Sequence, residues 1–261
     1  MPMYSLDLSG RTALIANVAN KRSIAWAIAE RLREAGARLI LSHLNEREEE
    51  AVLELVREAG WSDVRHVRCD ASDDASVEGL FRTVAGEFGR LDAFVHAMAF
   101  APREALSGQF LDTKRDAFRI ALDVSAYSFT RLMQGVAPLM TEGGSALTLT
   151  YMASERVVGG YNVMGSAKAA LEHAVRQLAA ELGERNIRVN AVSAGPLNTL
   201  AARGVRGFVD MLQYHREHAP LRRNITHDEV AKAALFLLSD MGSGVTGEVL
   251  HVDAGYNIMG M

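Results

Sequence analysis

The sequence predicts an α/β protein built on one doubly wound parallel sheet. Short apolar runs alternate with longer helical patterns from one end of the chain to the other. These runs are rich in Val, Ile, Leu and Ala and show little polar alternation, as expected for strands that are covered on both faces. Repeated strand–helix–strand order requires right-handed crossovers, which place helices on both sides of a parallel sheet.

About seven strands are expected, at Thr12–Ala16, Arg38–Ser42, Val64–Arg68, Leu91–Ala97, Ser145–Thr150, Ile187–Val192 and Glu248–Val252. Helices are expected between them, among others at Ser23–Glu34, Glu46–Glu58, Asp73–Glu87, Asn162–Leu182 and His227–Ser239. Gly36 and Gly183 each follow a helix, where a left-handed residue closes the last turn. No repeat, low-complexity stretch or linker interrupts this order, so we expect residues 1–261 to form a single Rossmann-type dinucleotide-binding domain.

Composition limits the class of protein further. The chain has 261 residues, 49% of them hydrophobic, and a formal charge of −4. The charge argues against nucleic-acid binding, which needs a basic face. Cys69 is the only cysteine, so an intrachain disulfide is impossible, which fits a reducing cytosol. We expect no signal peptide and no membrane helix, because neither a basic-then-apolar N-terminus nor a sufficiently long apolar run is present. The expected location is therefore cytoplasmic.

Two longer connections leave the carboxyl ends of expected strands, where open parallel sheets bind ligands. They are Phe100–Thr113 and Gly195–Pro220. The second connection carries an unusual amount of apolar surface, from Leu197, Leu200, Val205, Phe208 and Met211. We interpret the region around 195–220 as a substrate lid, with an ordinary surface connection as the alternative.

The first expected strand runs into a loop that could hold a pyrophosphate. Ser23 is a natural N-cap, and the helix that begins at Ile24 would offer unpaired N–H groups to an anion. The loop has no glycine, so the G-x-G-x-x-G pattern is absent. Asn17 and Asn20 are the expected substitutes, because Asn tolerates the left-handed conformation. A capped helix without a ligand is the alternative.

Other residues at strand ends extend this nucleotide site. Asp70 could accept a hydrogen bond from an adenine amino group, or could simply stabilise a turn. Ala97 and Ala99 are small enough for a flat ring or a substrate to pass close to the backbone, although close core packing is equally compatible. No acidic residue for a ribose 2′-hydroxyl follows the second strand, and the possible partners of a 2′-phosphate are Lys21, Arg22 and Arg47. The choice between NADH and NADPH stays open at this point.

Tyr161 and Lys168 are the strongest chemical signal. They are seven positions apart, a spacing that on one helix would place both on the same face. The ammonium would favour phenolate character and bind ribose hydroxyls, and Tyr161 could donate to a substrate oxygen that gains negative charge. Tyr151 could face the same cleft as an orienting or proton-donating group, or as an aromatic wall. The alternative is a surface lysine and a half-buried tyrosine.

No metal site is expected from the sequence. His215 and His218 have the spacing of a ligand pair on the expected lid helix, but no third ligand is evident. Solvent-exposed histidines are the simpler interpretation.

These residues together resemble a known family. The chain resembles the enoyl-acyl-carrier-protein reductases, divergent members of the short-chain dehydrogenase/reductase superfamily, in register over nearly its whole length. The segments that carry this resemblance are Ser23-Ile-Ala, Phe100-Ala-Pro, Ser125-Ala-Tyr-Ser, Tyr161-Asn-Val-Met-Gly with Lys168, Arg188-Val-Asn-Ala, Ser193-Ala-Gly-Pro and Gly247-Glu248 with His251-Val-Asp-Ala-Gly. Its most specific feature is Tyr-x6-Lys with Tyr151 upstream, whereas ordinary superfamily members carry Tyr-x3-Lys, a spacing that Gly165 excludes here.

The resemblance implies a reaction and a site. NADH would reduce the C2–C3 double bond of a trans-2-enoyl thioester on acyl carrier protein, in fatty-acid elongation. Tyr161 would hydrogen-bond the thioester oxygen, and Lys168 would hold the nicotinamide ribose. The resemblance also implies a homotetramer. Cofactor-contacting positions are implied at Ser23, Ile24, Asp70, Ala97, Lys168, Leu197 and Thr199, with Asn17 where the family usually has Gly. Acyl-pocket and lid positions are implied at Tyr151, Met164, Phe208 and Met211.

Two other functions remain open from the sequence. An ordinary short-chain dehydrogenase of the 3-oxoacyl reductase type needs a Ser about thirteen residues before its Tyr, and Thr148 stands there with a hydroxyl that could serve. A nucleotide-binding scaffold without catalysis is the third possibility, because a fold does not determine a function.

Overall fold

The computed structural model describes residues 6–199, 202 and 207–260. Its strands are β1 (Thr12–Ala16), β2 (Arg38–His43), β3 (Arg65–Arg68), β4 (Ala93–His96), β5 (Gly144–Thr150), β6 (Ile187–Ala194) and β7 (Val249–Val252). Its helices are α1 (Ile24–Glu34), α2 (Glu46–Glu58), α3 (Asp74–Phe88), α4 (Arg115–Leu122), α5 (Ser128–Leu139), α6 (Val163–Leu182), α7 (Phe208–His218) and α8 (His227–Leu238). All seven expected strands are present, and their ends differ from the predicted ends by no more than a few residues.

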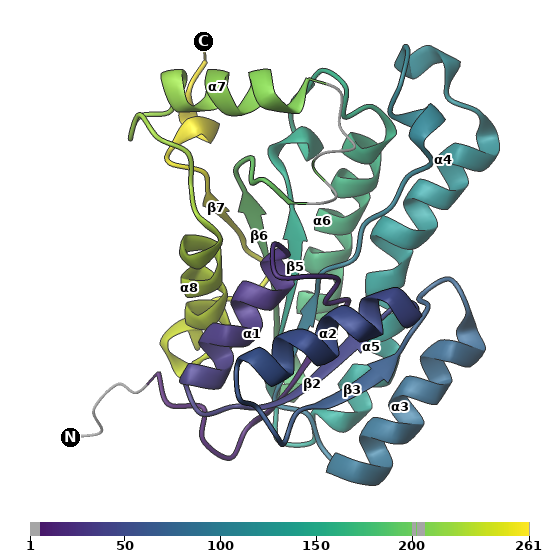
Figure 1. Ribbon diagram of the computed structural model, residues 1–261, viewed down its shortest axis with the longest axis vertical. Coiled ribbons are helices and arrows are strands. Elements are labelled where there is room, and N and C mark those ends of the chain that lie inside the picture. The colour runs from purple at the N-terminus through teal and green to yellow at the C-terminus, as the bar shows by residue number, and fades with distance from the viewer. Residues whose placement is uncertain (1–5, 200–201, 203–206, 261) are drawn as a thin grey trace.

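The seven strands form one parallel sheet in the order β3-β2-β1-β4-β5-β6-β7. The chain therefore first adds β2 and β3 on one side of β1. It then crosses back and adds β4 to β7 on the other side (Figure 1). This order confirms the doubly wound, Rossmann-type fold that the sequence predicts.

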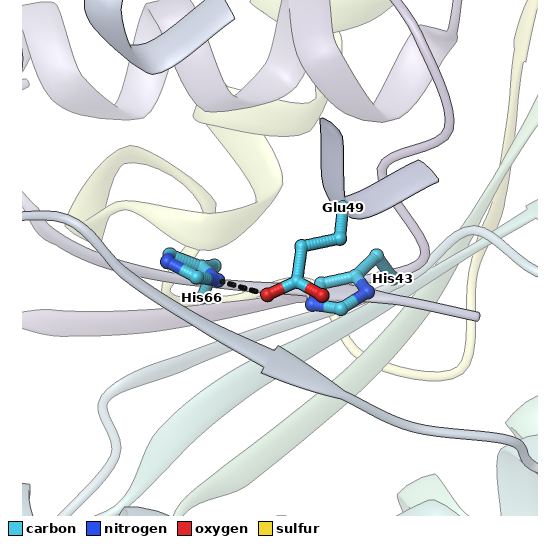
Figure 2. Close-up of side chains that lie close together, drawn as sticks. All are labelled: His43, Glu49 and His66. Carbon is cyan, nitrogen blue, oxygen red and sulfur yellow. Dashed lines mark ion pairs between the residues drawn. The ribbon is translucent and has the colours of Figure 1, made fainter. Parts of the chain in front are cut away.

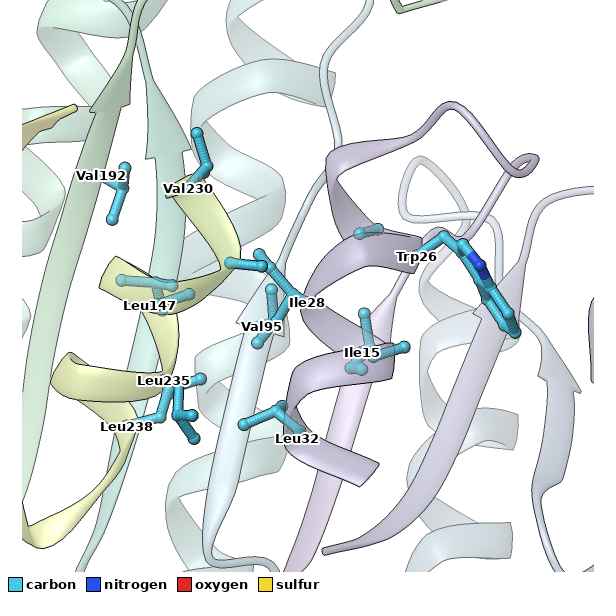
Figure 3. Close-up of a cluster of buried hydrophobic side chains, with 14 of the residues drawn as sticks. Ile15, Trp26, Ile28, Leu32, Val95, Leu147, Val192, Val230, Leu235 and Leu238 are labelled. Carbon is cyan, nitrogen blue, oxygen red and sulfur yellow. The ribbon is translucent and has the colours of Figure 1, made fainter. Parts of the chain in front are cut away.

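Helices cover both faces of the sheet, and each face has its own apolar core. The first core joins α1, α2 and α8 to alternate residues of the strands, with Ile15 among them (Figure 3). The second core joins α3, α5 and α6 to the other set, with Leu14 among them. Ile15 and Leu14 are neighbours in β1 and point to opposite faces, because successive strand residues alternate in direction. This is why the strands lack a polar face in the sequence.

Cys69 follows β3 and lies in the second core, almost fully buried. Burial raises the pKa of its thiol to about 12, and the nearby carboxylate of Asp70 adds to the shift. The thiol is therefore protonated at neutral pH.

The helix ends correct one sequence prediction. Gly36 has a φ of +92° and follows α1 as expected. Gly183 does not close its helix in the left-handed conformation, because its φ is −60° and a short 3₁₀ turn, Gly183–Arg185, continues from α6. Asn186 takes the left-handed conformation instead, with a φ of +55°. The left-handed residue at the end of this segment is thus Asn186 and not Gly183, because an asparagine tolerates this conformation.

Among the helices of the described residues, none is both long enough and apolar enough to cross a membrane.

Candidate active site

The carboxyl ends of β1 and β4 meet at the point where the sheet reverses its direction of growth. Ala16 and His96 are register partners at these ends. The chain then leaves each strand, and the Ala97 N–H donates to the Ala16 carbonyl across a distance of 3.1 Å. Crevices at such a switch point are where open parallel sheets bind their ligands. Asn17 and Ala97, both expected to contact a cofactor, therefore lie at the entrance of this crevice.

The loop after β1 forms largely as predicted. Asn17 has a φ of +69°, the left-handed conformation expected for a residue in place of glycine, and its N–H donates to Ser42 Oγ at 3.0 Å. Ser23 caps α1, since its Oγ accepts a hydrogen bond from the Trp26 N–H. The N–H groups of Ile24 and Ala25 lie in the first turn, where no intrahelical acceptor exists. An anion can bind to these donors.

The prediction for Asn20 was wrong, because Asn20 is not left-handed. Its Oδ1 accepts from the Arg22 N–H at 2.8 Å, and its carbonyl accepts from the Ser23 N–H. Asn20 thus shapes the loop through hydrogen bonds instead.

The other expected cofactor positions are spread along the carboxyl edge of the sheet. Asp70 follows β3 and accepts from both the N–H and the hydroxyl of Ser72, so it stabilises a turn, as the alternative interpretation held. Leu197 and Thr199 follow β6, and Leu197 is buried in the first core. The set therefore extends across the sheet from β3 to β6, an arrangement that suits an elongated dinucleotide.

Tyr151 and Tyr161 lie in direct ring contact. Tyr151 follows β5, and the ring centroids are 5.0 Å apart with an interplanar angle of 62°. Burial raises the pKa of Tyr161, and the neighbouring Tyr151 adds to the shift. Burial also raises the pKa of Tyr151, to about 12. Both phenols keep their protons at neutral pH and can act as hydrogen-bond donors.

Tyr161 does not lie on the helix that carries Lys168, contrary to the prediction from spacing. Helix α6 begins at Val163, so Tyr161 precedes the helix and does not share a helical face with Lys168. Asn162 separates Tyr161 from the helix with a φ of +42° and a ψ of −123°. This backbone turn, which spacing alone does not reveal, directs the chain from Tyr161 into α6.

Lys168 is not a surface lysine. Its side chain is buried, with 5% of the residue exposed, and Nζ donates to the Leu149 carbonyl of β5 at 2.8 Å. Burial lowers the pKa of Lys168 to about 8, while the carboxylate of Glu172 partly opposes this shift. An ammonium that is held this way has two further protons to donate.

Glu172 was missed by the sequence analysis. It is buried one turn after Lys168 on α6, and it accepts from the Thr150 hydroxyl at 2.6 Å. Its spacing of four residues from Lys168 was the signal that could have revealed it, because such residues lie on the same face of a helix.

Thr148, the possible substitute for a catalytic serine, lies inside the sheet. It is fully buried, and its Oγ1 lies 2.8 Å from His96 Nδ1. The hydroxyl at the position where an ordinary short-chain dehydrogenase has its catalytic serine is thus part of a buried hydrogen-bond network here. Gly165 excludes the shorter Tyr-x3-Lys arrangement sterically as well, because a Cβ there would lie 2.8 Å from the Ala153 carbonyl.

Two methionines contact the tyrosine pair, and Met164 packs in the same apolar cluster as Tyr161. Met164 and Phe208 are buried, and the Tyr151 hydroxyl donates to the Met211 sulfur at 3.4 Å, which connects α7 to the pair. Ala99 lies exposed in the connection after β4. Leu200, Arg203, Val205 and Arg206, which belong to the expected lid, lie outside the described residues.

His215 corrects the expectation of two exposed histidines. It is buried, and its Nδ1 lies 3.1 Å from Asn224 Oδ1. His218 stacks on the ring of Tyr214, with centroids 3.8 Å apart. Both histidines therefore take part in packing around α7.

Ser125 fixes the connection after β4. It lies in a π-helical turn, Asp123–Tyr127, between α4 and α5. Its Oγ accepts from the Phe100 N–H at 2.9 Å and donates to the Phe100 carbonyl at 3.0 Å. Ser125 was not among the site residues predicted from the sequence.

The sheet order, the open carboxyl edge at β1 and β4, the tyrosine pair after β5 and the buried lysine held at Leu149 of β5 define a dinucleotide-dependent oxidoreductase of the short-chain dehydrogenase/reductase class. The model of the family described as enoyl-(acyl carrier protein) reductase matches residues 18–257. The chain therefore belongs to the enoyl-(acyl carrier protein) reductase family.

Relatives agree with this assignment over the full chain. The chain is 49% identical to the enoyl-acyl-carrier-protein reductase (NADH) of Nostoc sp., over 98% of this chain and 100% of the relative. It is 48% identical to the corresponding Bacillus subtilis enzyme, over 97% and 98% of the two chains.

Solved structures extend the similarity to three dimensions. The Bacillus cereus enoyl-acyl carrier protein reductase, in complex with NADP⁺ and an indole naphthyridinone, superposes with a TM-score of 0.96 at 47% identity. That match covers 98% of this chain and 100% of the other. The Aquifex aeolicus enoyl-acyl-carrier-protein reductase (NADH) gives a TM-score of 0.93 at 43% identity, with 97% and 99% covered.

Proposed function

We propose that Tyr161 and Lys168 carry out the reaction of this chain, which is the NADH-dependent reduction of enoyl-acyl-carrier-protein thioesters in fatty-acid synthesis. The single observation that carries the proposal is that the Tyr151–Tyr161 pair and the buried Lys168 both contact the carboxyl-terminal part of β5: Tyr151 follows the strand, and Lys168 donates to Leu149 near its end. When bound, NADH supplies the hydride that adds to C3 of the enoyl group.

The residues at the sheet edge fit this cofactor. The first turn of α1, capped by Ser23, would bind the pyrophosphate together with the backbone at Asn17 and Ile24. Asp70 would accept a hydrogen bond from the adenine amino group. Its Oδ1 already accepts from Ser72, and its other carboxylate oxygen can accept from the amino group. Ala97, Leu197 and Thr199 would lie along the nicotinamide half. Lys168 would donate to the ribose hydroxyls.

The tyrosines would act on the substrate oxygen. Negative charge develops on the thioester carbonyl oxygen as the double bond is reduced, and a positioned O–H donor stabilises that charge. Tyr161 keeps its proton because burial raises its pKa, so its hydroxyl is available as this donor. Tyr151 would orient the ring of Tyr161 and the thioester through the edge-to-face contact. Ala99, Met164, Phe208 and Met211 would line the acyl chain.

Helix α7 and the residues around it would form the lid of a single catalytic domain, as the sequence analysis expected for 195–220. Support comes from the contact between Tyr151 and Met211, because this contact must break or shift when an acyl chain enters beside Tyr151.

Self-association as a homotetramer is proposed through the face formed by α4, the π-helical turn and α6. Phe118 and Tyr127 are exposed aromatic side chains on this face, and they line a groove with Ala126, Ala170 and Ala174. Exposed aromatic groups beside small residues are typical of protein interfaces. We further propose a cytoplasmic location, which the single buried cysteine supports.

An assay of the purified protein tests the function. Oxidation of NADH and of NADPH is followed with a trans-2-enoyl thioester and, in parallel, with a 3-oxoacyl thioester of the same chain length. Rapid oxidation of NADH with the enoyl substrate alone is expected. Activity only with the 3-oxo compound would overturn the proposal in favour of an ordinary dehydrogenase, and cofactor binding without either activity would favour a scaffold.

A further inference from the structure

Two histidines and a glutamate converge at β2 and β3, which β1 and β4 separate from β5 and the tyrosine pair. His43 ends β2, His66 lies in the neighbouring strand β3, and Glu49 lies in the first turn of α2. One potential ligand atom from each of the three side chains lies within 4.8 Å of the other two. Figure 2 shows the Glu49 carboxylate between the two imidazole rings.

His43 has a feature that core packing does not explain. Only 1% of the residue is exposed, and among the described residues its buried Nδ1 has no hydrogen-bond partner. Buried polar atoms in proteins are nearly always satisfied. The Asn45 backbone lies near the imidazole, but no described atom forms a well-aligned hydrogen bond to Nδ1, so the ring is not committed to a protein partner.

The other two groups complete a suitable donor set. His66 Nδ1 lies 3.4 Å from Glu49 Oε1, so this pair is already in contact. Both side chains are partly exposed, at 28% and 39%, and can adjust toward a shared ion. Glu46, Glu48 and Glu49 make the first turn of α2 acidic, which favours a cation at this end of the helix.

We propose that His43, Glu49 and His66 bind a zinc ion, with a water molecule as the fourth ligand. Two imidazoles and one carboxylate are a known zinc donor set for sites that keep one open position. Tetrahedral coordination with bonds of about 2.0–2.1 Å would bring the ligand atoms to about 3.3 Å from one another. Glu49 and His66 would make most of this movement, because His43 is fixed in the core. Copper(II) would bind the same donors, since its affinity for such sites exceeds that of zinc.

Zinc titration of the full-length protein, free of any purification tag, tests the proposal. A coloured zinc indicator competes for the metal, and cobalt(II) gives a second readout through its visible absorption in a four-coordinate site. We expect one zinc ion per chain and a rise in the thermal midpoint on zinc addition, because a ligand that binds only the folded state stabilises it.

Variants locate the site. His66→Gln and Glu49→Gln should each weaken zinc binding by at least about tenfold, because each removes one of three protein ligands. His173→Gln, an exposed histidine on α6, is the matched control and should leave the affinity unchanged. Equal affinity in wild type, His66→Gln and Glu49→Gln would overturn the proposal, as would the absence of any zinc binding. In that case His66 and Glu49 form only an ion pair.

Discussion

The buried setting of Tyr161 determines how its hydroxyl can act. Burial raises the pKa of this phenol, so the group enters the reaction with its proton in place. It can then donate a hydrogen bond to a substrate oxygen without first taking up a proton from solvent. The T-shaped contact with Tyr151 holds the ring in one orientation.

Removal of this hydroxyl should affect turnover and little else. For Tyr161→Phe we expect kcat with an enoyl thioester to fall by about 10²-fold or more, since only the oxygen contact is lost. The dissociation constant for NADH should stay within about twofold. Steady-state kinetics and fluorescence titration measure the two quantities, and Tyr127→Phe, at an exposed tyrosine, is the control. Wild-type turnover in Tyr161→Phe would contradict the assigned role.

Lys168 should make cofactor binding depend on pH. Burial lowers its pKa from the ordinary 10.5 to about 8, so the ammonium is present below about pH 8 and is lost above it. NADH affinity should therefore fall as the pH rises through 8, because the neutral amine donates fewer hydrogen bonds and carries no charge. Lys168→Met should bind NADH more weakly at pH 7 and lose this dependence. If the same titration persists in Lys168→Met, another group is responsible.

At the scale of elements, α6 is placed by close backbone packing. The helix approaches the short 3₁₀ turn Met152–Ser154, and Gly165 is the residue at the contact. This approach sets the position of Lys168, one turn further along the helix, against the carbonyl of Leu149.

Gly165→Ala should lower the thermal midpoint. The added Cβ would lie 2.8 Å from the Ala153 carbonyl oxygen, a backbone atom that cannot move aside without shifting the turn. A loss of about 1–3 kcal/mol in the free energy of unfolding is expected for such overpacking. Gly79→Ala in α3 is the matched control, because a Cβ there meets nothing within 4 Å. That change should stabilise the protein by about 0.5–1 kcal/mol. Equal midpoints for the two variants would argue against close packing at Gly165.

The sequence predicts the elements of this fold well because parallel strands covered on both faces are continuously apolar. The strand Thr12–Ala16 and the helix Glu46–Glu58 form with the predicted ends. Features that depend on single backbone angles were predicted only in part: Asn17 and Gly36 are left-handed as expected, but two other positions differ. The φ of +42° at Asn162 separates Tyr161 from α6, and the turn at Gly183 continues in a right-handed conformation.

The same contrast holds for the candidate sites. Lys168 and Tyr161 were predicted as site residues from their spacing, although the helical geometry inferred from that spacing was wrong. His43 and His66 were missed because they lie on separate strands, and only the pairing of β2 with β3 brings them together. Glu49 enters this group from α2, so no local pattern in the sequence contains all three residues.

At the scale of the whole molecule, the order of strands distributes the proposed cofactor-contacting residues across the sheet. Asp70 follows the edge strand β3, while Leu197 and Thr199 follow β6 on the other side of the switch point. Residues far apart in the chain thus come to one edge. The proposed interface lies elsewhere, on α4 and α6.

Phe118→Arg should reduce the oligomeric state. The new guanidinium would lie between Arg115 and Arg119 on the proposed interface, and pairing two such faces would bring like charges together. Light scattering after gel filtration should give four chains for the wild type and fewer for this variant. Val157→Arg, which replaces a fully exposed residue elsewhere, should leave the wild-type value. An unchanged mass for Phe118→Arg would place the interface on another face.

The burial of Cys69 provides a means of watching local opening of the protein. Only the thiolate reacts with alkylating reagents, and this thiol is both protonated and enclosed in the folded state. Modification therefore requires the region of β3 and α3 to open transiently, and its rate measures how often that happens. Because Asp70 is the next residue, a dinucleotide bound there would slow the modification. Labelling rates would then report cofactor occupancy in an enzyme that is not turning over.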